Sequence, residues 1–410
     1  MKIAIIGAGP AGAMAAIRLA RAGASVQLFD PSHPREKPCG GGVTGRALAL
    51  IADVVDLKTL AAVVVKSATV EAQENGSRTP FPARVDLLDR GIARQSSLVV
   101  LSRAVFDAAL VNAAVESGAQ LSPRKVVKVT RGNEQILVAT ARAEYAVDFV
   151  VGADGANSLV RKTFSRPFTR AEMSIAAGYL VDGASSPDIV IACVAEQPGY
   201  LWSFPRLDHL AVGVCARAIE GAAAGKLRAQ SLAWIRSHGL YGGGDLRQYA
   251  WPIPSAGFGR AVDLRAAGER WMLVGDAAGL VDPLTREGIY YALLSGGWAA
   301  EALMRSPAHA AASYQQRVTE EIYPELSRAA ALSGLFFSRD FSNAFVAALR
   351  ESGRIRDVFR DLVAGAQPYG GLRRRLLATR EWKLAGRAAL LVVQSTGHFL
   401  PEFARSSAGL

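Results

Sequence analysis

The sequence predicts an α/β fold, in which a Rossmann-type dinucleotide-binding domain carries an inserted antiparallel β-sheet domain and is followed by a C-terminal helical region. Two glycine-rich turns predict the first domain, one near the N-terminus and one at Gly275 and Asp276. Segments between 175 and 214 are β-rich and broken by glycine and proline, which predicts a separate sheet. From Ala310 onward the pattern is mostly helical.

The N-terminal segment has the pattern of a strand, a glycine-rich turn, a helix and a second strand. Residues 2–6 form a short apolar run, 13–22 have a helical pattern, and 25–29 return to a strand that ends at Asp30. The three glycines permit a tight turn, a close approach to a pyrophosphate and close packing of the helix on the strand. Asp30 is placed to hydrogen-bond a ribose hydroxyl. We expect dinucleotide contacts from Gly7, Gly9, Ala11, Gly12, Asp30 and Pro31.

A helix and a strand are expected between the two turns. The helix is expected over 102–115, capped by the side chain of its first residue, a serine. Arg103 and Asp107 lie four residues apart in its first turns, a spacing that permits an ion pair. The strand is expected over 145–151, and it leads into a glycine-containing turn with Asp154.

The second turn indicates which dinucleotide binds. A strand over 271–274 leads into Gly275 and Asp276, and a helix begins near Gly288. FAD binds its pyrophosphate at the first helix and extends its ribityl chain and flavin well beyond it, so a second loop must hold the far end. Asp276 offers a carboxylate to the ribityl hydroxyls, and the positive end of the later helix favours an anionic reduced flavin. We therefore expect FAD and a Rossmann-type FAD-binding domain. The alternative is an ordinary strand-to-helix turn in which Asp276 is only a cap.

The order of these patterns predicts a discontinuous first domain. The FAD-binding domain is expected at 1–70, 91–165 and 260–310. The substrate-binding β-sheet domain is expected at 71–90 and 166–259, and the C-terminal helical region at 311–410.

Composition disfavours several other classes of protein. The three cysteines show no CxxC spacing, the five histidines lack metal-ligand spacing, and no GxSxG motif is present, so we expect neither a metal site nor a hydrolase. No apolar stretch approaches the roughly 20 residues of a membrane-spanning helix. The apolar N-terminus reads better as a buried strand than as a signal peptide. We expect a cytoplasmic protein.

The net charge of +11 suits an anionic partner. Without aromatic residues interleaved among the basic ones, nucleic-acid binding is not expected. The densest basic cluster is either a solvated helix or a peripheral contact with the inner membrane face. It comprises Arg373, Arg374, Arg375, Arg380, Lys383 and Arg387.

Four motifs together resemble the large group of FAD enzymes that includes aromatic hydroxylases, halogenases and geranylgeranyl reductases. They are GAGPAG with Asp30, Arg103 with Asp107, GADGANSLVRK, and VGDAAGLVDP. Their order and spacing match from the first residue to about Ala300. The resemblance implies that Arg103, Asp154 and Gly155 lie near the cofactor. A helix-face ion pair for Arg103 and a turn cap for Asp154 remain the local alternatives.

Three further segments are similar to the geranylgeranyl reductases and their bacterial relatives. They read KPCGGGV over 37–43, PGYLWSFP over 198–205 and DPLTREGI over 282–289. Consecutive glycines let the first segment lie flat against a ring, and its Cys39 thiol can deliver a proton. The resemblance places Tyr200 and Trp202 against an alkene. It also implies cofactor contacts from Gly41, Gly42, Pro283, Gly288 and Ile289, and a substrate contact from Phe204.

One position departs from the family pattern. The usual TGEGI reads TREGI here, with Arg286 in place of the first glycine. An arginine beside the flavin either binds an anionic substrate group or narrows the pocket. Local alternatives also remain for the reductase residues, because a cysteine is often an inert small hydrophobe and alternating aromatics in a strand are often core.

The resemblance implies an FAD-dependent reductase that transfers hydride from reduced flavin to a carbon–carbon double bond. The expected partners are a hydrophobic small molecule, a prenyl diphosphate or lipid, and an external electron donor, NAD(P)H or a ferredoxin. One alternative is a flavin monooxygenase or halogenase, although halogenases usually show WxWxIP where this chain has YLWSFP. Another is a non-catalytic flavoprotein that relays electrons.

Overall fold

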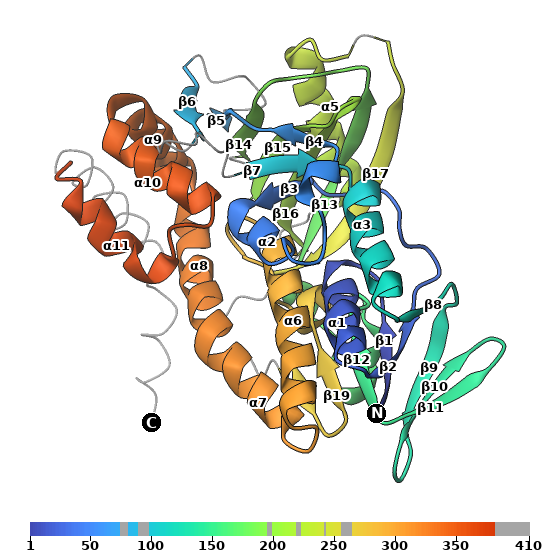
Figure 1. Cartoon of the computed structure of the whole chain (residues 1–410). Coiled ribbons are helices and arrows are strands. Elements are labelled where there is room, and N and C mark those ends of the chain that lie inside the picture. The colour runs from blue at the N-terminus through green and yellow to red at the C-terminus, as the bar shows by residue number, and fades with distance from the viewer. Residues whose placement is uncertain are drawn as a thin grey trace, which may run out of the picture.

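The computed structural model has three parts (Figure 1). A Rossmann-type domain forms the lower part of the view, a large β-sheet lies above it, and the C-terminal helices run along one side. The structure describes residues 1–73, 81–88, 98–194, 199–218, 223–241, 243–255 and 265–381. The end of the basic cluster, from Lys383 onward, and Pro198 of the PGYLWSFP segment lie outside the described residues.

The Rossmann-type domain is built on a six-stranded sheet with strand order β18-β19-β12-β1-β2-β8. Its strands pair in parallel except at β18, which runs antiparallel to β19. Helix α1 contacts both α3 and α6. The helices that carry or adjoin the predicted FAD-binding residues are therefore packed against one another. The strands are β1 (Lys2–Ile6), β2 (Ser25–Phe29), β8 (Gln120–Ser122), β12 (Phe149–Gly152), β18 (Ala267–Gly268) and β19 (Trp271–Leu273). The helices are α1 (Pro10–Arg21), α3 (Arg103–Glu116), α4 (Leu159–Phe164) and α6 (Ile289–Arg305).

The large sheet has seven strands in the order β17-β13-β16-β15-β14-β5-β6. All neighbours are antiparallel except β5 and β14, which are parallel. Helix α5 (Ala224–Ser237) packs on β13 and β16. The strands are β5 (Ser67–Gln73), β6 (Ala83–Asp86), β13 (Met173–Asp182), β14 (Ile189–Val194), β15 (Gly199–Pro205), β16 (His209–Arg217) and β17 (Leu246–Pro254).

Two small sheets and several short helices complete these two parts. One sheet has the order β3-β7-β4 and the other β11-β10-β9. Their strands are β3 (Gly42–Thr44), β4 (Ala62–Val64), β7 (Leu98–Leu101), β9 (Val126–Arg131), β10 (Ile136–Thr140) and β11 (Glu144–Val147). The short helices are α2 (Gly45–Ala49), η1 (Leu57–Thr59), η2 (Arg170–Glu172) and η4 (Gly275–Ala278).

The C-terminal region is helical, as predicted. It runs from the Rossmann-type domain to the far edge of the large sheet, where α9 packs on β5, β6 and β14. No helix among the described residues is long and apolar enough to cross a bilayer. The elements are α7 (Ala310–Arg317), the π-helical η5 (Val318–Ile322), α8 (Tyr323–Phe336), α9 (Arg339–Glu351), α10 (Gly353–Val363) and α11 (Tyr369–Ala378).

The structure confirms the predicted fold class but corrects two local predictions. The expected single strand over 145–151 is wrong, because β11 and β12 belong to different sheets and meet at Asp148. The Asp148 carboxylate accepts a hydrogen bond from the Lys2 backbone N–H, which fixes this break beside β1. The predicted Ser102 cap is also wrong. The Ser102 hydroxyl instead donates to the Glu36 carboxylate, which also accepts the Arg103 backbone N–H at the start of α3.

Candidate active site

The glycine-rich turn forms an open cradle at the N-terminus of α1. Gly7 has φ +104°, a left-handed conformation that glycine adopts without strain, and a Cβ on Gly12 would overlap the Gly7 carbonyl oxygen. Gly9 has room above it. The atoms nearest to the position of a Gly9 Cβ are Lys37 Nζ at 3.6 Å and His33 Nε2 at 3.8 Å. The turn therefore leaves space where the sequence predicts the pyrophosphate.

Asp30 holds the loop that follows β2. Its Oδ2 atom accepts the Ala8 backbone N–H at 2.9 Å and lies 2.7 Å from His33 Nδ1, while Oδ1 accepts the backbone N–H groups of Ser32 and His33. Burial opposes the charge, but these hydrogen bonds outweigh it and hold the pKa of Asp30 well below its usual range. Pro31 is exposed. The ribose contact of Asp30 stays a prediction.

The second turn packs directly on the first. Gly275 has φ +57°, and its N–H donates to Ser295 Oγ at 2.9 Å. A Cβ on Gly275 would lie 3.0 Å from the Ala11 Cβ, and one on Gly296 would overlap the Ala11 carbonyl oxygen. Helices α1 and α6 thus meet backbone to backbone, and they bring the two predicted turns into one site (Figure 1).

The Asp276 carboxylate faces this site. It accepts no hydrogen bond among the described residues, and its Oδ1 atom lies 3.4 Å from the position of a Gly288 Cβ. Burial raises the pKa of Asp276, while Lys37 and Arg103 act in the opposite direction. Pro283 is buried and Ile289 begins α6 beside this group. The carboxylate can therefore accept hydrogen bonds from hydroxyl groups of a ligand.

Arg103 and Asp107 form a buried pair on α3. Two hydrogen bonds of 2.9 Å and 2.8 Å join them, and their side chains are 8% and 0% exposed. Burial opposes both charges, but the pairing raises the pKa of Arg103 and lowers that of Asp107. Cys39 also contributes to the raised pKa of Arg103, so the guanidinium lies beside the sulfur. The ion pair that was the local alternative for Arg103 is therefore present, and it faces the loop that contains Cys39.

The cysteine loop lies against the large sheet. Arg206 Nη2 donates to the Cys39 carbonyl oxygen at 2.9 Å, and Arg206 Nη1 donates to the Leu101 carbonyl oxygen. The Gly41 N–H lies 3.3 Å from Cys39 Sγ. Cβ atoms on Gly40 and Gly42 would lie 2.7 Å and 2.9 Å from the Phe204 ring. Gly40 and Gly42 therefore lie against an aromatic ring, and this ring is the side chain of Phe204.

The aromatic residues of the PGYLWSFP segment line one face of β15. Tyr200, Trp202 and Phe204 alternate along the strand, and Tyr200 is opposite Cys215 on β16. Trp202 is 6% exposed, and its Nε1–H has no hydrogen-bond partner among the described residues. The Tyr200 hydroxyl donates to the Thr285 carbonyl oxygen at 2.7 Å, and burial raises the pKa of Tyr200. Tyr200 thus joins the sheet to the DPLTREGI loop.

Arg286 has the backbone conformation of a glycine. Its φ is +60°, in the left-handed region, which gives a physical reason for the glycine of the family pattern at this position. Its Nη1 donates to Ser255 Oγ, and its buried Nε makes no hydrogen bond within the described ranges. No carboxylate pairs with Arg286 in the part of the chain that the structure describes. An unneutralised guanidinium therefore lies between the loop and the sheet.

Asp154 has the capping role that was its local alternative, and its position near the cofactor stays a prediction. Its Oδ2 atom accepts the Leu159 N–H at 2.6 Å at the start of α4, so the local alternative of a cap is present. Its Oδ1 atom is buried and has no hydrogen-bond partner in the described part of the chain, and burial raises the pKa of this carboxyl. Gly155, with φ +76°, has nothing within 4 Å of the position of a Cβ.

Sequence reasoning missed a polar cluster on the other side of the DPLTREGI loop. Glu287 forms an ion pair with Arg46 and accepts a hydrogen bond from Thr44 Oγ1 at 2.8 Å. Burial raises the pKa of Glu287, and Arg46 opposes this shift. The pair lines a cavity of about 380 Å³ beside Tyr290 and Tyr291. No local pattern joins positions 46 and 287, so only the fold reveals the cluster.

The fold and this site define an FAD-dependent oxidoreductase. The residues present fit FAD, because the cradle at Gly9 is open, His33 Nε2 makes no hydrogen bond, and Asp276 has no partner among the described residues. Residues 1–199 match the FAD binding domain family.

Relatives of known name identify the family. The chain is 30% identical over 325 residues to a menaquinone reductase of Mycolicibacterium smegmatis, with 73% of this chain and 75% of that protein covered. It is 28% identical over 346 residues to a geranylgeranyl diphosphate reductase of Synechocystis sp., with 74% and 75% covered. A geranylgeranyl bacteriochlorophyll reductase-like protein of Thermoplasma acidophilum shares the fold, with TM-score 0.73, 20% identity, and 92% and 98% of the two chains covered. The chain belongs to the geranylgeranyl reductase family of FAD-dependent oxidoreductases.

Proposed function

We propose that this enzyme reduces carbon–carbon double bonds of an isoprenoid or prenyl-lipid substrate. One observation carries the proposal: the Cys39 loop rests on the aromatic face of β15, so a thiol and the Tyr200 and Trp202 rings belong to one surface. The names of the two relatives, a geranylgeranyl diphosphate reductase and a menaquinone reductase, support it.

Cys39 is the proposed proton donor. When bound, FAD supplies the hydride that adds to one carbon of the double bond, and NAD(P)H or a ferredoxin returns the two electrons. Cys39 gives a proton to the other carbon and is reprotonated from water. This step is general acid catalysis by a positioned thiol.

Tyr200 and Trp202 are proposed to wall the reacting end of the substrate. Trp202 is almost fully buried, and Tyr200 stacks on Phe337 at a centroid distance of 6.1 Å. These rings exclude water and offer an apolar surface to an alkene. Phe204 supports the cysteine loop, and a substrate contact from its exposed part remains a proposal.

Arg286 is proposed to bind an oxygen-bearing group of the substrate. A buried Nε–H without an acceptor is costly, so an acceptor brought by a ligand stabilises it. The cofactor contacts that the sequence motifs and the resemblance predict are kept as proposals, and they are Gly7, Gly9, Ala11, Gly12, Asp30, Pro31, Gly41, Gly42, Arg103, Asp154, Gly155, Gly275, Asp276, Pro283, Gly288 and Ile289.

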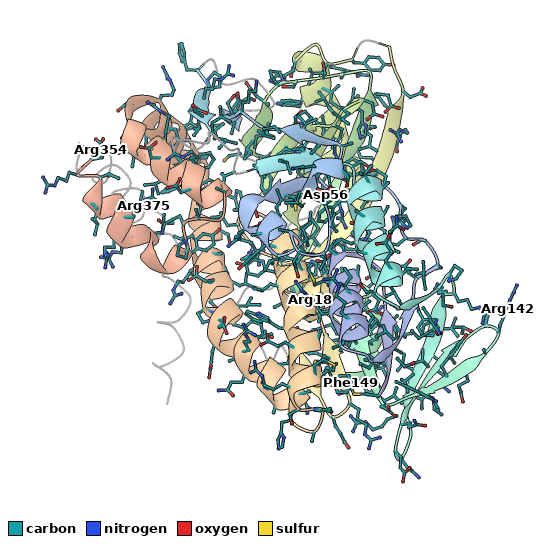
Figure 2. All side chains as sticks on the ribbon, viewed as in Figure 1. Arg18, Asp56, Arg142, Phe149, Arg354 and Arg375 are labelled. Atoms are coloured by element: carbon teal, nitrogen blue, oxygen red, sulfur yellow. The ribbon has the colours of Figure 1, made fainter. Side chains whose placement is uncertain are left out.

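A peripheral membrane contact through α11 is also proposed. Arg373 and Arg374 are exposed, and the neighbouring Leu376 and Leu377 are 39% and 47% exposed. Basic and apolar side chains exposed together suit an anionic lipid surface. Figure 2 shows Arg375 in the outer helices of the C-terminal region, where it pairs with Asp361.

The test is an anaerobic incubation of the reduced enzyme with geranylgeranyl diphosphate and with a menaquinone. We expect a mass increase of one hydrogen pair for each double bond reduced, measured by mass spectrometry. If every prenyl substrate is recovered unchanged while the flavin is reoxidised, the enzyme is an electron relay. Product that forms only with oxygen present identifies a monooxygenase or halogenase instead.

A further inference from the structure

The Lys37 ammonium is a partly buried charge with which no acidic side chain among the described residues pairs directly. Its side chain makes no hydrogen bond or ion pair among the described residues, and its Nζ atom lies over Gly9. Burial lowers the pKa of Lys37 to about 8. Arg103 and Arg35 act in the same direction, while Asp107 and Asp276 act against it. A charge held in this way is stabilised by an anion that enters the site.

The His33 ring is the second group above Gly9. Its side chain is 6% exposed, and Asp30 fixes it through Nδ1 at 2.7 Å. The opposite Nε2 atom lies near the position of a Gly9 Cβ. It makes no hydrogen bond to any residue that the structure describes, although Asp107 Oδ2 is 3.2 Å away. Asp30 thus holds a ring nitrogen at the mouth of the cradle.

The N-terminus of α1 adds positive potential to the same point. Gly9 is the N-cap, no side chain caps the helix, and its first turn contains no acidic residue. The unpaired backbone N–H groups of a helix start bind phosphate readily. A helix terminus, an ammonium and an imidazole therefore converge on one small volume.

We propose that Lys37 and His33 close over the start of α1 as a clamp for the diphosphate of FAD, Lys37 by its charge and His33 by a hydrogen bond that its doubly protonated ring donates from Nε2, with Nδ1–H held by Asp30. The proposal depends on the cofactor and is independent of which substrate is reduced. Lys37 belongs to the KPCGGGV segment, so the same loop would fix the diphosphate and present Cys39.

The clamp makes FAD binding depend on pH. Because the pKa of Lys37 lies below its ordinary value of 10.5 in the folded protein, its charge destabilises the folded apoprotein below about pH 8. That cost disappears as the pH rises from about 8 toward 10.5. A bound diphosphate raises the pKa again, so binding takes up a proton. Above pH 8 the FAD dissociation constant should rise by up to about tenfold per pH unit.

The test uses apoprotein prepared by removing FAD and titrated with FAD and with riboflavin, which lacks the diphosphate. We expect Lys37→Met to raise the Kd for FAD about 10-fold to 100-fold, the range for a hydrogen bond to a charged group. It should remove most of the pH dependence above pH 8, and leave the Kd for riboflavin unchanged. Lys37→Arg should keep most of the affinity, and His33→Gln should lower it less than Lys37→Met.

Arg35→Met is the matched control, because Arg35 belongs to the same loop but lies over the Trp251 ring at 5.2 Å. At pH 7, below the Lys37 pKa of about 8, Lys37 is mostly charged with or without Arg35, so the Kd of this variant for FAD should match that of the wild type. Melting of each apoprotein checks folding, and Lys37→Met should melt no lower than the wild type at pH 7. An unchanged Kd for FAD in Lys37→Met, or an equal loss of riboflavin affinity, would overturn the proposal. Neither result bears on double-bond reduction.

Discussion

The site has two sides that differ in structure: an FAD side formed by α1 and α6, and a sheet side formed by β15 and the loop that carries Arg286. On the FAD side, α1 and α6 meet backbone to backbone, and a methyl group on Gly12 or Gly296 would overlap a carbonyl oxygen. On the sheet side, β15 presents large rings such as Trp202, and the loop beside it carries the guanidinium of Arg286. Backbone contacts admit no added atom, whereas side chains can be exchanged. The difference suggests how one family can keep a single cofactor and vary its substrate.

The largest effect is expected from the buried pair beneath the FAD side. Asp107→Asn leaves the Arg103 charge buried without its partner, so the free energy of unfolding should fall by about 3–5 kcal/mol. Arg305→Gln removes a pair with Glu301 at the same four-residue spacing, but with side chains 73% and 47% exposed. It should cost less than about 0.5 kcal/mol. Urea unfolding measures both, and equal losses would contradict the description of the FAD side.

A neighbouring pair of glycines on α6 tests the backbone contact itself. Gly296→Ala should destabilise the protein by about 1–3 kcal/mol and weaken FAD binding, because the new Cβ forces α6 away from Ala11. Gly297→Ala meets only the Met14 side chain at 3.9 Å. It should stabilise the helix by about 0.5–1 kcal/mol. Thermal melting and the FAD dissociation constant check both variants, and indistinguishable results would exclude the close packing.

Arg286 allows backbone strain to be separated from side-chain chemistry on the sheet side. Glycine adopts the left-handed conformation of position 286 without strain, whereas alanine keeps the strain. Arg286→Gly should therefore be more stable than Arg286→Ala by about 1 kcal/mol. Both variants should lower kcat/KM for a substrate with an oxygen-bearing group by the same factor, because both remove the guanidinium. Steady-state kinetics with paired melting curves makes the measurement. A kcat/KM unchanged in both variants would remove Arg286 from the substrate site.

The FAD side was predictable because its signals are local. The glycine spacing around Gly9 and the Gly275–Asp276 turn report backbone geometry that favours glycine. The structure places the first at the start of α1 and the second in η4, which contacts α6. The fold class followed from the same local patterns. The sequence-based predictions were wrong where a residue distant in the sequence determines the local structure. Glu36 replaces the Ser102 cap, and Asp148 divides one apolar run between two sheets.

Contacts between distant positions explain the rest of what sequence patterns missed. Arg46 pairs with Glu287, and Arg206 holds the Cys39 carbonyl oxygen, although no spacing rule links either pair. His33 and Lys37 stand in a loop without regular structure, and only the fold places them over Gly9.

The most direct test of double-bond reduction at this site is anaerobic single-turnover reoxidation of the reduced flavin by geranylgeranyl diphosphate. We predict that Cys39→Ala slows reoxidation and product formation by about 10²–10⁴, the usual contribution of a positioned proton donor, with unchanged FAD affinity. Cys193→Ala, at a buried cysteine of β14, should react like the wild type. Reoxidation and product formation at the wild-type rate in Cys39→Ala would contradict the proposed chemistry.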